Sequence, residues 1–131
     1  MNTDDAQMVT DEELNDLSRR VLAAAFIVSN TLGCNFKEKI YENALCHELL
    51  KRGIGAQKQV PIQVFYDGIV VGDFFADILV EDVLLLELKR SDATHEEHLA
   101  QALNYLSATG LPLCLILNFG TPRIGIKRVR L

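Results

Sequence analysis

Three charged residues interrupt two apolar segments in the middle of the chain. Asp77 lies within residues 69–79, and Glu87 and Lys89 lie within residues 83–89. Side chains of these types are rarely buried without partners, so their presence in apolar segments needs a chemical explanation. Two carboxylates can bind a hard divalent cation such as Mg²⁺, and a nearby ammonium group can stabilise charge on a phosphate. The residue types therefore indicate a metal site that acts on phosphate esters.

The loop between the two segments decides whether the carboxylates meet, because side chains alternate between the two faces of a strand. A two-residue turn at residues 81–82 would place Asp77 and Glu87 on opposite faces. A three-residue turn at residues 80–82 would pair Asp77 with Leu85. Glu87 would then be the diagonal neighbour of Asp77, with Cα atoms roughly 7–8 Å apart. A shared metal site therefore requires an odd loop or a bulge.

The same expected strand, residues 83–89, also offers a third candidate ligand. The backbone carbonyl of Leu88 is a candidate third oxygen ligand, since Mg²⁺ accepts backbone carbonyls and keeps several waters. A purely structural interpretation also stays open. In that interpretation Glu87 and Lys89 form an ion pair where a strand reaches solvent, and Asp77 caps a turn.

The apolar periodicity predicts one α/β domain around these strands. The expected helices are residues 11–32, 36–52 and 95–108, and the expected strands are residues 55–66, 69–79, 83–89, 113–118 and 124–129. Asp67-Gly68 predicts a hairpin turn, and Pro61 favours an edge strand because it has no ladder donor. Asn35 with Glu38, and Thr94 with Glu97, predict capping boxes at two helix starts.

Composition limits the class of protein. The chain has 131 residues, 49% of them hydrophobic and 24% charged, as expected for one globular domain, 1–131, with a flexible N-terminus at residues 1–10. No apolar run approaches the ~20 residues of a membrane span. The acidic N-terminus lacks a signal-peptide layout, so we expect a cytoplasmic protein. Three widely spaced cysteines predict reduced thiols without a disulfide framework.

The charges of the chain support two opposing expectations about nucleic-acid binding. The net charge of −5 argues against a broad basic surface of the kind that usually binds nucleic acid. Four basic residues nevertheless crowd the last nine positions: Arg123, Lys127, Arg128 and Arg130. They form either a local basic patch or the solvated edge of a strand, and we favour the edge slightly.

An ordered series of short motifs resembles the PD-(D/E)XK nuclease superfamily, and more closely its small GxxExxY branch. The series consists of residues 35–41 (NFKEKIY), continued to Leu45, followed by Gln59-Val60-Pro61, Tyr66-Asp67-Gly68, Ala76-Asp77, Glu87-Leu88-Lys89, Gln101-Ala102-Leu103-Asn104-Tyr105 and Asn118-Phe119-Gly120. The resemblance covers roughly residues 32–129. One departure is Asn35, which stands where the first glycine of the branch motif is expected.

The resemblance implies a fold and a metal-binding core. The fold is a restriction-endonuclease-like core, with a central mixed β-sheet flanked by helices. Asp77 and Glu87 correspond to the metal ligands of the superfamily, and Lys89 corresponds to its catalytic lysine. Glu38, or with less support Glu42, corresponds to the helical acidic residue that approaches the site in many members.

Two more residues match a pattern of RecB-like nucleases. Gln101 and Tyr105 fit the Q-xxx-Y motif that follows the core in those enzymes. Their spacing of four places them on one helix face. We therefore include both among the expected catalytic residues, where they would face the nucleic-acid backbone or the attacking water.

The leading functional hypothesis is a Mg²⁺- or Mn²⁺-dependent nuclease that hydrolyses phosphodiester bonds, with DNA as the favoured substrate. The alternative is a catalytically inactive module of the same fold that binds nucleic acid or a protein partner. The sequence does not separate a toxin-like or defence-associated effector from the first hypothesis. A homodimer is plausible, because a small nuclease with one site often needs two copies to cut a duplex.

Overall fold

The computed structural model describes residues 9–90 and 95–131. The elements are, in chain order, α2 (Asp11–Leu32), α3 (Glu38–Lys51), β1 (Ala56–Tyr66), β2 (Ile69–Val80), β3 (Leu84–Lys89), α4 (His95–Thr109), β4 (Leu113–Asn118) and β5 (Gly125–Val129). Most of the expected flexible segment, and the expected helix cap Thr94, lie outside the described residues. Over the part of the chain that is described, no helix is long and apolar enough to cross a membrane.

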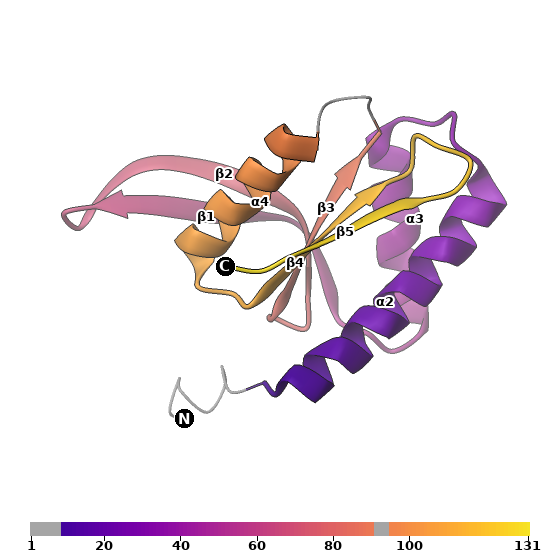
Figure 1. Ribbon diagram of the computed structural model, residues 1–131, viewed down its shortest axis with the longest axis horizontal. Helices are drawn as coiled ribbons and strands as arrows, with labels where there is room; N and C mark the ends of the chain where they lie inside the picture. Colours follow the sequence, from indigo (N-terminus) through magenta and orange to yellow (C-terminus); the bar gives the residue numbers. More distant parts are fainter. Residues whose placement is uncertain (1–8, 91–94) are drawn as a thin grey trace.

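The strands form one five-stranded mixed sheet in the order β1-β2-β3-β4-β5. Only β3 and β4 are parallel, and α4 connects them, as parallel neighbours require a crossover. Helices α2 and α3 pack on one face of the sheet and α4 packs on the other (Figure 1). The predicted α/β class, with a central mixed sheet flanked by helices, is confirmed.

The central strand β3 is buried on both faces, and its alternate side chains enter two different cores. Leu84, Leu86 and Leu88 join the core under α2 and α3. Leu85 instead joins the core under α4, together with Ile116. Glu87 has the same parity as Leu85, so its side chain belongs to the α4 face of the sheet. The strand thereby carries a carboxylate into an otherwise apolar layer.

Helix α2 begins and ends as the sequence predicts. Thr10 accepts a hydrogen bond from the Glu13 backbone at 3.0 Å, and the Glu13 carboxylate accepts from the Thr10 backbone, which completes a capping box. Gly33 ends the helix at φ 78°, a conformation that costs glycine little. The buried residues Val21 and Val28 are two turns apart on the face that meets the core.

The predicted capping box at the start of α3 is wrong. Its N-cap is Lys37, which makes no side-chain cap, and Glu38 is already the first helical residue. The loop from α2 is closed instead by Tyr41, whose buried hydroxyl donates to the Gly33 carbonyl at 2.6 Å. Asn35 is not among the residues with positive φ. The buried Tyr41 side chain therefore holds the loop before α3, where a local capping box was predicted.

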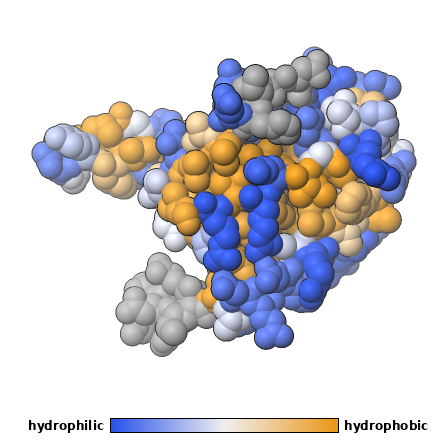
Figure 2. Space-filling view, viewed as in Figure 1, coloured by the Kyte–Doolittle hydropathy of each residue, from blue (hydrophilic) through white to orange (hydrophobic). Residues whose placement is uncertain are grey.

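Strands β1 and β2 extend beyond the body of the sheet as a two-stranded arm (Figure 1). Its turn is Asp67-Gly68, with φ values of 53° and 75°, which confirms the predicted hairpin. Pro61 lies in β1, an edge strand, as expected. The arm carries several exposed apolar side chains, including Phe65 and Tyr66, and Figure 2 shows apolar colouring along it.

The loop between β2 and β3 has the predicted odd length but lies one residue later than expected. It consists of residues 81–83, and Val80 pairs with Leu84. Continuing this register places Asp77 opposite Glu87 itself, whereas the sequence analysis paired Asp77 with Leu85 and made Glu87 a diagonal neighbour. Glu81 and Asp82 adopt left-handed backbone conformations, with φ values of 50° and 59°, which tighten the turn. The regular pairing ends at Ile78, and beyond it the Asp77 and Glu87 carboxyl groups come together through hydrogen bonds to the neighbouring backbone.

Candidate active site

Asp77 and Glu87 lie where β2 and β3 separate. The regular ladder between these strands covers only Val80, Leu79 and Ile78, so the backbone beyond Ile78 needs other partners. The Leu88 N–H donates to Asp77 Oδ2 at 2.7 Å, and the Asp77 N–H faces Glu87 Oε1 at 3.4 Å. Side chains replace the ladder bonds at this fork, and this holds both carboxylates in place.

The two carboxyl groups strongly disfavour simultaneous ionisation. Glu87 is only 3% exposed, and burial followed by repulsion from Asp77 raises its pKa to about 9. Burial also raises the pKa of Asp77, against the lowering effect of the Leu88 N–H. Without a cation, the pair therefore holds a proton at neutral pH. A divalent cation would supply the positive charge that this buried pair lacks.

Lys89 lies on the same strand face, and its ammonium is held by a residue of α4. Its Nζ donates to Gln101 Oε1 at 2.6 Å. No salt bridge joins Lys89 to Glu87 anywhere in the described ranges, so the simple ion pair considered above is not what the structure shows. Lys89 instead lowers the pKa of Glu87 and of Asp77 from nearby. Its ammonium therefore lies close to both carboxylates without being neutralised by either.

Tyr105 is placed beside this group, one helical turn after Gln101. Its side chain is 7% exposed, and burial together with the negative charge of Glu87 and Asp77 raises its pKa to about 12. The Gln101 side chain hydrogen-bonds to it and acts in the opposite direction. Tyr105 is therefore a neutral donor at physiological pH. The structure brings Gln101, Tyr105 and Lys89 together, and the catalytic roles expected for Gln101 and Tyr105 stay predictions.

A small cavity of about 160 Å³ opens next to the fork on the α3 side. Its lining residues come from four elements and share polar or main-chain groups that can face an ion: Glu38, Lys39, Glu42, Gln59, Asp77 and Leu88. The cavity thus brings the helical acidic residues to the strand pair. This juxtaposition depends on α3 crossing the sheet at the point where β2 leaves β3.

Glu38 and Glu42 differ in how they are held. Glu42 is 4% exposed, accepts from Gln59 Nε2 at 2.5 Å and pairs with Lys39 at 2.9 Å. Glu38 is more exposed, and the structure gives it no salt bridge over the residues it describes. Partial burial raises the pKa of Glu38, while Lys89 acts against that rise. Glu38 is thus the carboxylate better able to turn toward a ligand.

Gln59, like Lys39, is a residue of this cavity for which the sequence predicted no role. It has a φ of 51° and interrupts the pairing of β1 with β2 opposite Asp77. Because its side chain reaches Glu42, it links the edge strand to α3. Its only sequence signal is its place in a quoted motif, since a glutamine in a strand has no feature that predicts a left-handed conformation.

Two of the four basic residues near the C-terminus are engaged with α2. Arg128 contacts Asn15 at 2.5 Å, and Arg130 pairs with Asp11 at 3.1 Å, so both hold β5 and the last residues against α2. Strand β5 is an edge strand, in agreement with the edge interpretation. Two of the four basic residues of this cluster are therefore engaged in holding the sheet edge against α2.

The fold and this arrangement define an α/β domain with an acidic pair and a lysine on neighbouring strands. A family model described as the PD-(D/E)XK nuclease superfamily matches residues 15–129, and the chain belongs to that superfamily. Assignment to its GxxExxY branch stays a prediction.

A solved structure gives a second comparison, limited to the fold. The chain is similar to the crystal structure of an alkaline exonuclease (LHK-Exo) from Laribacter hongkongensis, with a TM-score of 0.53 and 14% sequence identity. The match covers 96% of this chain and 73% of the exonuclease chain. A search of curated proteins gave no significant match.

Proposed function

We propose that this protein is a Mg²⁺- or Mn²⁺-dependent nuclease that hydrolyses phosphodiester bonds, with DNA as its substrate. The proposal depends chiefly on one observation: the Asp77 and Glu87 carboxyl groups come together at the β2–β3 fork, with Lys89 nearby. Membership of a nuclease superfamily supports the same chemistry. Other pairs of buried acids occur in proteins, but here a lysine and two further polar residues converge on the pair.

The donor set suits a hard divalent cation. Asp77, Glu87 and the Leu88 carbonyl would hold it, with Glu38 as a further acidic neighbour. No group of three His, Cys, Asp or Glu side chains is arranged for a metal within the described residues. A Mg²⁺ ion does not require such a group, because it binds through one or two carboxylates and keeps several waters. When bound, such a cation polarises a phosphate oxygen and makes a coordinated water easier to deprotonate.

The chain's own residues would position the phosphate and stabilise its charge. Lys89, held by Gln101, presents an ammonium that can contact a phosphate oxygen or orient the attacking water. Tyr105 keeps its proton below a pKa of about 12 and can donate a hydrogen bond throughout the neutral range. We therefore assign Lys89 to stabilising the charge that develops on the phosphate. We assign Gln101 and Tyr105 to positioning the Lys89 ammonium group.

The test is cleavage of labelled single-stranded and duplex DNA and RNA in Mg²⁺ or Mn²⁺. Lys89→Ala is expected to lower the cleavage rate by about 100-fold or more, the usual loss when one such group is removed. Lys127→Ala is the matched control, because it removes the same charge from an exposed position on β5. Absence of cleavage by the unmodified chain, or equal rates for both variants, would refute the proposal.

A second candidate is a module of this fold that binds nucleic acid or a protein without turnover. The observation in its favour is the net charge of −5, together with basic residues that are engaged with α2. Metal-independent binding to DNA that survives Asp77→Ala would support this candidate. Loss of Mn²⁺ affinity in that variant, measured by calorimetry, would count against it.

A further inference from the structure

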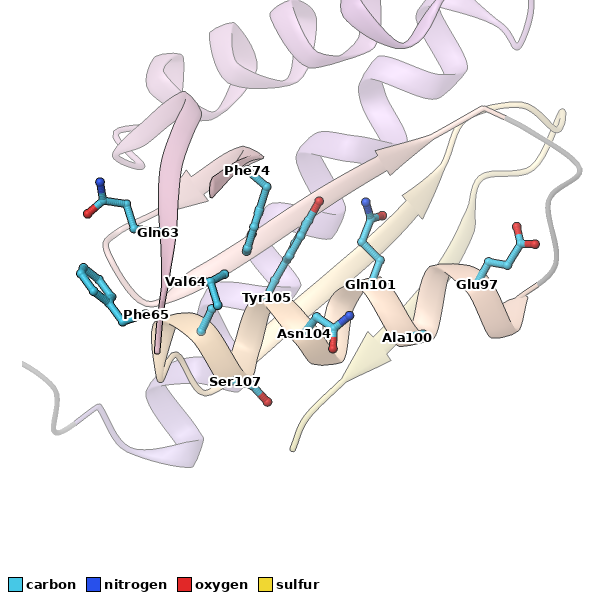
Figure 3. A pocket seen from close by; sticks show the side chains of 11 residues that line it. Gln63, Val64, Phe65, Phe74, Glu97, Ala100, Gln101, Asn104, Tyr105 and Ser107 are labelled. Atoms are coloured by element: carbon cyan, nitrogen blue, oxygen red, sulfur yellow. The ribbon is translucent and has the colours of Figure 1, made fainter. Parts of the chain in front are cut away.

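A groove of about 1040 Å³ runs between the β1–β2 arm and α4, beside the candidate active site (Figure 3). Strand β1 contributes Gln63 and Phe65 to it, and α4 contributes Gln101, Asn104 and Tyr105. Gln101 is also the residue that holds Lys89, so the groove is continuous with the site. Whatever occupies the groove lies next to the reacting phosphate.

The groove walls have the chemistry that recognises nucleobases. Phe74 and Tyr105 form a stacked pair across the groove floor, with ring centroids 4.1 Å apart and an angle of 11° between the rings. Phe65 is 59% exposed and lies at the end of the groove, where its ring points away from Phe74 and Tyr105 (Figure 3), so this ring remains available to a ligand there. Gln63 and Asn104 are exposed amides, which can donate to and accept from base edges. Aromatic faces flanked by amides suit flat, polar, uncharged rings.

The charge of the groove argues against contact with the phosphate backbone. Glu97 is its one charged residue, and no Lys or Arg is among the described residues that line it. A duplex presents phosphates outward and keeps its bases stacked, so it would gain little here. An unpaired strand can turn its bases into the groove while its phosphates remain in solvent or at Lys89.

We propose that this groove binds the unpaired nucleobases next to the cleaved phosphate, and hence that the protein prefers single-stranded nucleic acid. The inference rests on the proposed nuclease function and names its substrate class. From Gln101 to Ser107, α4 rises about 9 Å. At about 3.4 Å per nucleotide, that length holds two or three stacked bases. The groove thus covers the nucleotides directly beside the active site.

The test compares two neighbouring aromatic residues of the arm in the Lys89→Ala chain, which is used so that little substrate is cleaved during the measurement. Phe65→Ala removes the exposed ring in the groove. Tyr66→Ala is the matched control, since Tyr66 is 70% exposed, adjacent in sequence and absent from the groove lining. Phe65→Trp tests whether an aromatic face is sufficient. The measurement is fluorescence anisotropy of a labelled single-stranded oligonucleotide, and of the same strand in a blunt duplex, in Mg²⁺.

Phe65→Ala is expected to weaken single-strand binding by about ten-fold or more, the loss associated with one base–aromatic stack. Tyr66→Ala and Phe65→Trp should bind like the parent, and duplex affinity should not change. Equal losses for Phe65→Ala and Tyr66→Ala, or equal losses on single strand and duplex, would overturn the inference. So would a change in sedimentation mass caused by Phe65→Ala, because a second copy would then occupy the groove.

The outcomes also separate this inference from the nuclease proposal. If the unmodified chain does not cleave but Phe65→Ala still loses single-strand affinity selectively, then the groove binds bases and the proposed activity fails. If the unmodified chain cleaves single strands and duplexes alike, and Phe65→Ala binds normally, then the activity stands and the groove has no such role.

Discussion

Glu87 is the residue whose protonation state would respond most directly to a bound cation. It is buried in the central strand with Asp77 facing it, and its pKa is raised to about 9. The metal-free protein therefore avoids two adjacent buried charges by keeping a proton, as carboxylate pairs do elsewhere. A divalent cation would displace that proton, so metal affinity should rise with pH.

The stability of the metal-free protein follows from the same shift. Below about pH 4.5, the Glu87 carboxyl is protonated in both the folded and the unfolded chain. Between there and about pH 9, the folded chain keeps a proton that the unfolded chain releases, so folding stability falls as pH rises. The loss can reach about 1.4 kcal/mol per pH unit. Glu87→Gln is expected to remove most of this slope.

Urea denaturation in EDTA, at pH values from about 5 to 9, would measure the slope for both proteins. Glu87→Gln keeps an acceptor for the Asp77 N–H but carries no titrating proton. Excess Mn²⁺ should stabilise the unmodified protein more at high pH than at low pH, and should stabilise the variant less. Parallel pH profiles for the two proteins in EDTA would show that Glu87 does not hold the proton.

At the scale of elements, α2 owes its start to a local motif that can be tested alone. Thr10 and Glu13 cap each other, and Thr10 is exposed and far from the candidate site in sequence. Thr10→Ala is expected to lower the free energy of unfolding by about 1 kcal/mol, because the cap acceptor is lost. Thr10→Ser should retain most of the stability. Denaturant midpoints measured for Thr10→Ala and Thr10→Ser test whether the cap contributes this stability. The proposed nuclease activity, measured at low temperature, should be the same in both variants.

The contrast between α2 and α3 shows which elements the sequence predicts. For α2, the apolar periodicity predicted residues 11–32. The Thr10 cap, which was not predicted, and Gly33 also lie next to the helix, so local interactions fix its bounds. For α3, the start is fixed by Tyr41, which bonds to Gly33 and stacks on Phe119 of a distant loop. That contact exists only after β4 is in place. The predicted Asn35 cap failed because a tertiary contact replaced the local one.

The site was predictable to the level of strand faces but no further. Alternation along β3, together with an odd loop, was enough to place Asp77 and Glu87 on one side. The register was missed by one step, because left-handed conformations at Glu81 and Asp82 moved the turn. Non-glycine residues at such angles leave no clear sequence signal. Gln59 was missed for the same reason.

At the scale of the whole molecule, the proposed function implies that nucleic-acid binding would depend on the metal. The chain carries a net charge of −5, and Arg128 and Arg130 are engaged with α2. The candidate site adds buried carboxylates that would repel phosphate when ionised. A bound divalent cation reverses the local sign, and Lys89 then acts in the same direction. Under the proposed function, electrostatic attraction to a nucleic-acid backbone is therefore concentrated at the candidate active site.

Attraction concentrated at the cation and Lys89 predicts that affinity for nucleic acid depends on the cation. In the Lys89→Ala chain, Mn²⁺ should increase affinity for single-stranded DNA by about ten-fold or more over EDTA, and Asp77→Ala should abolish the increase. Since few phosphates are contacted, affinity should fall only shallowly with salt, with a slope near −0.7 for each phosphate neutralised on a single strand. Anisotropy titrations at several salt concentrations measure both quantities. Equal affinity in Mn²⁺ and EDTA, with a steep salt slope, would reveal a basic surface elsewhere on the protein and favour the inactive binding module.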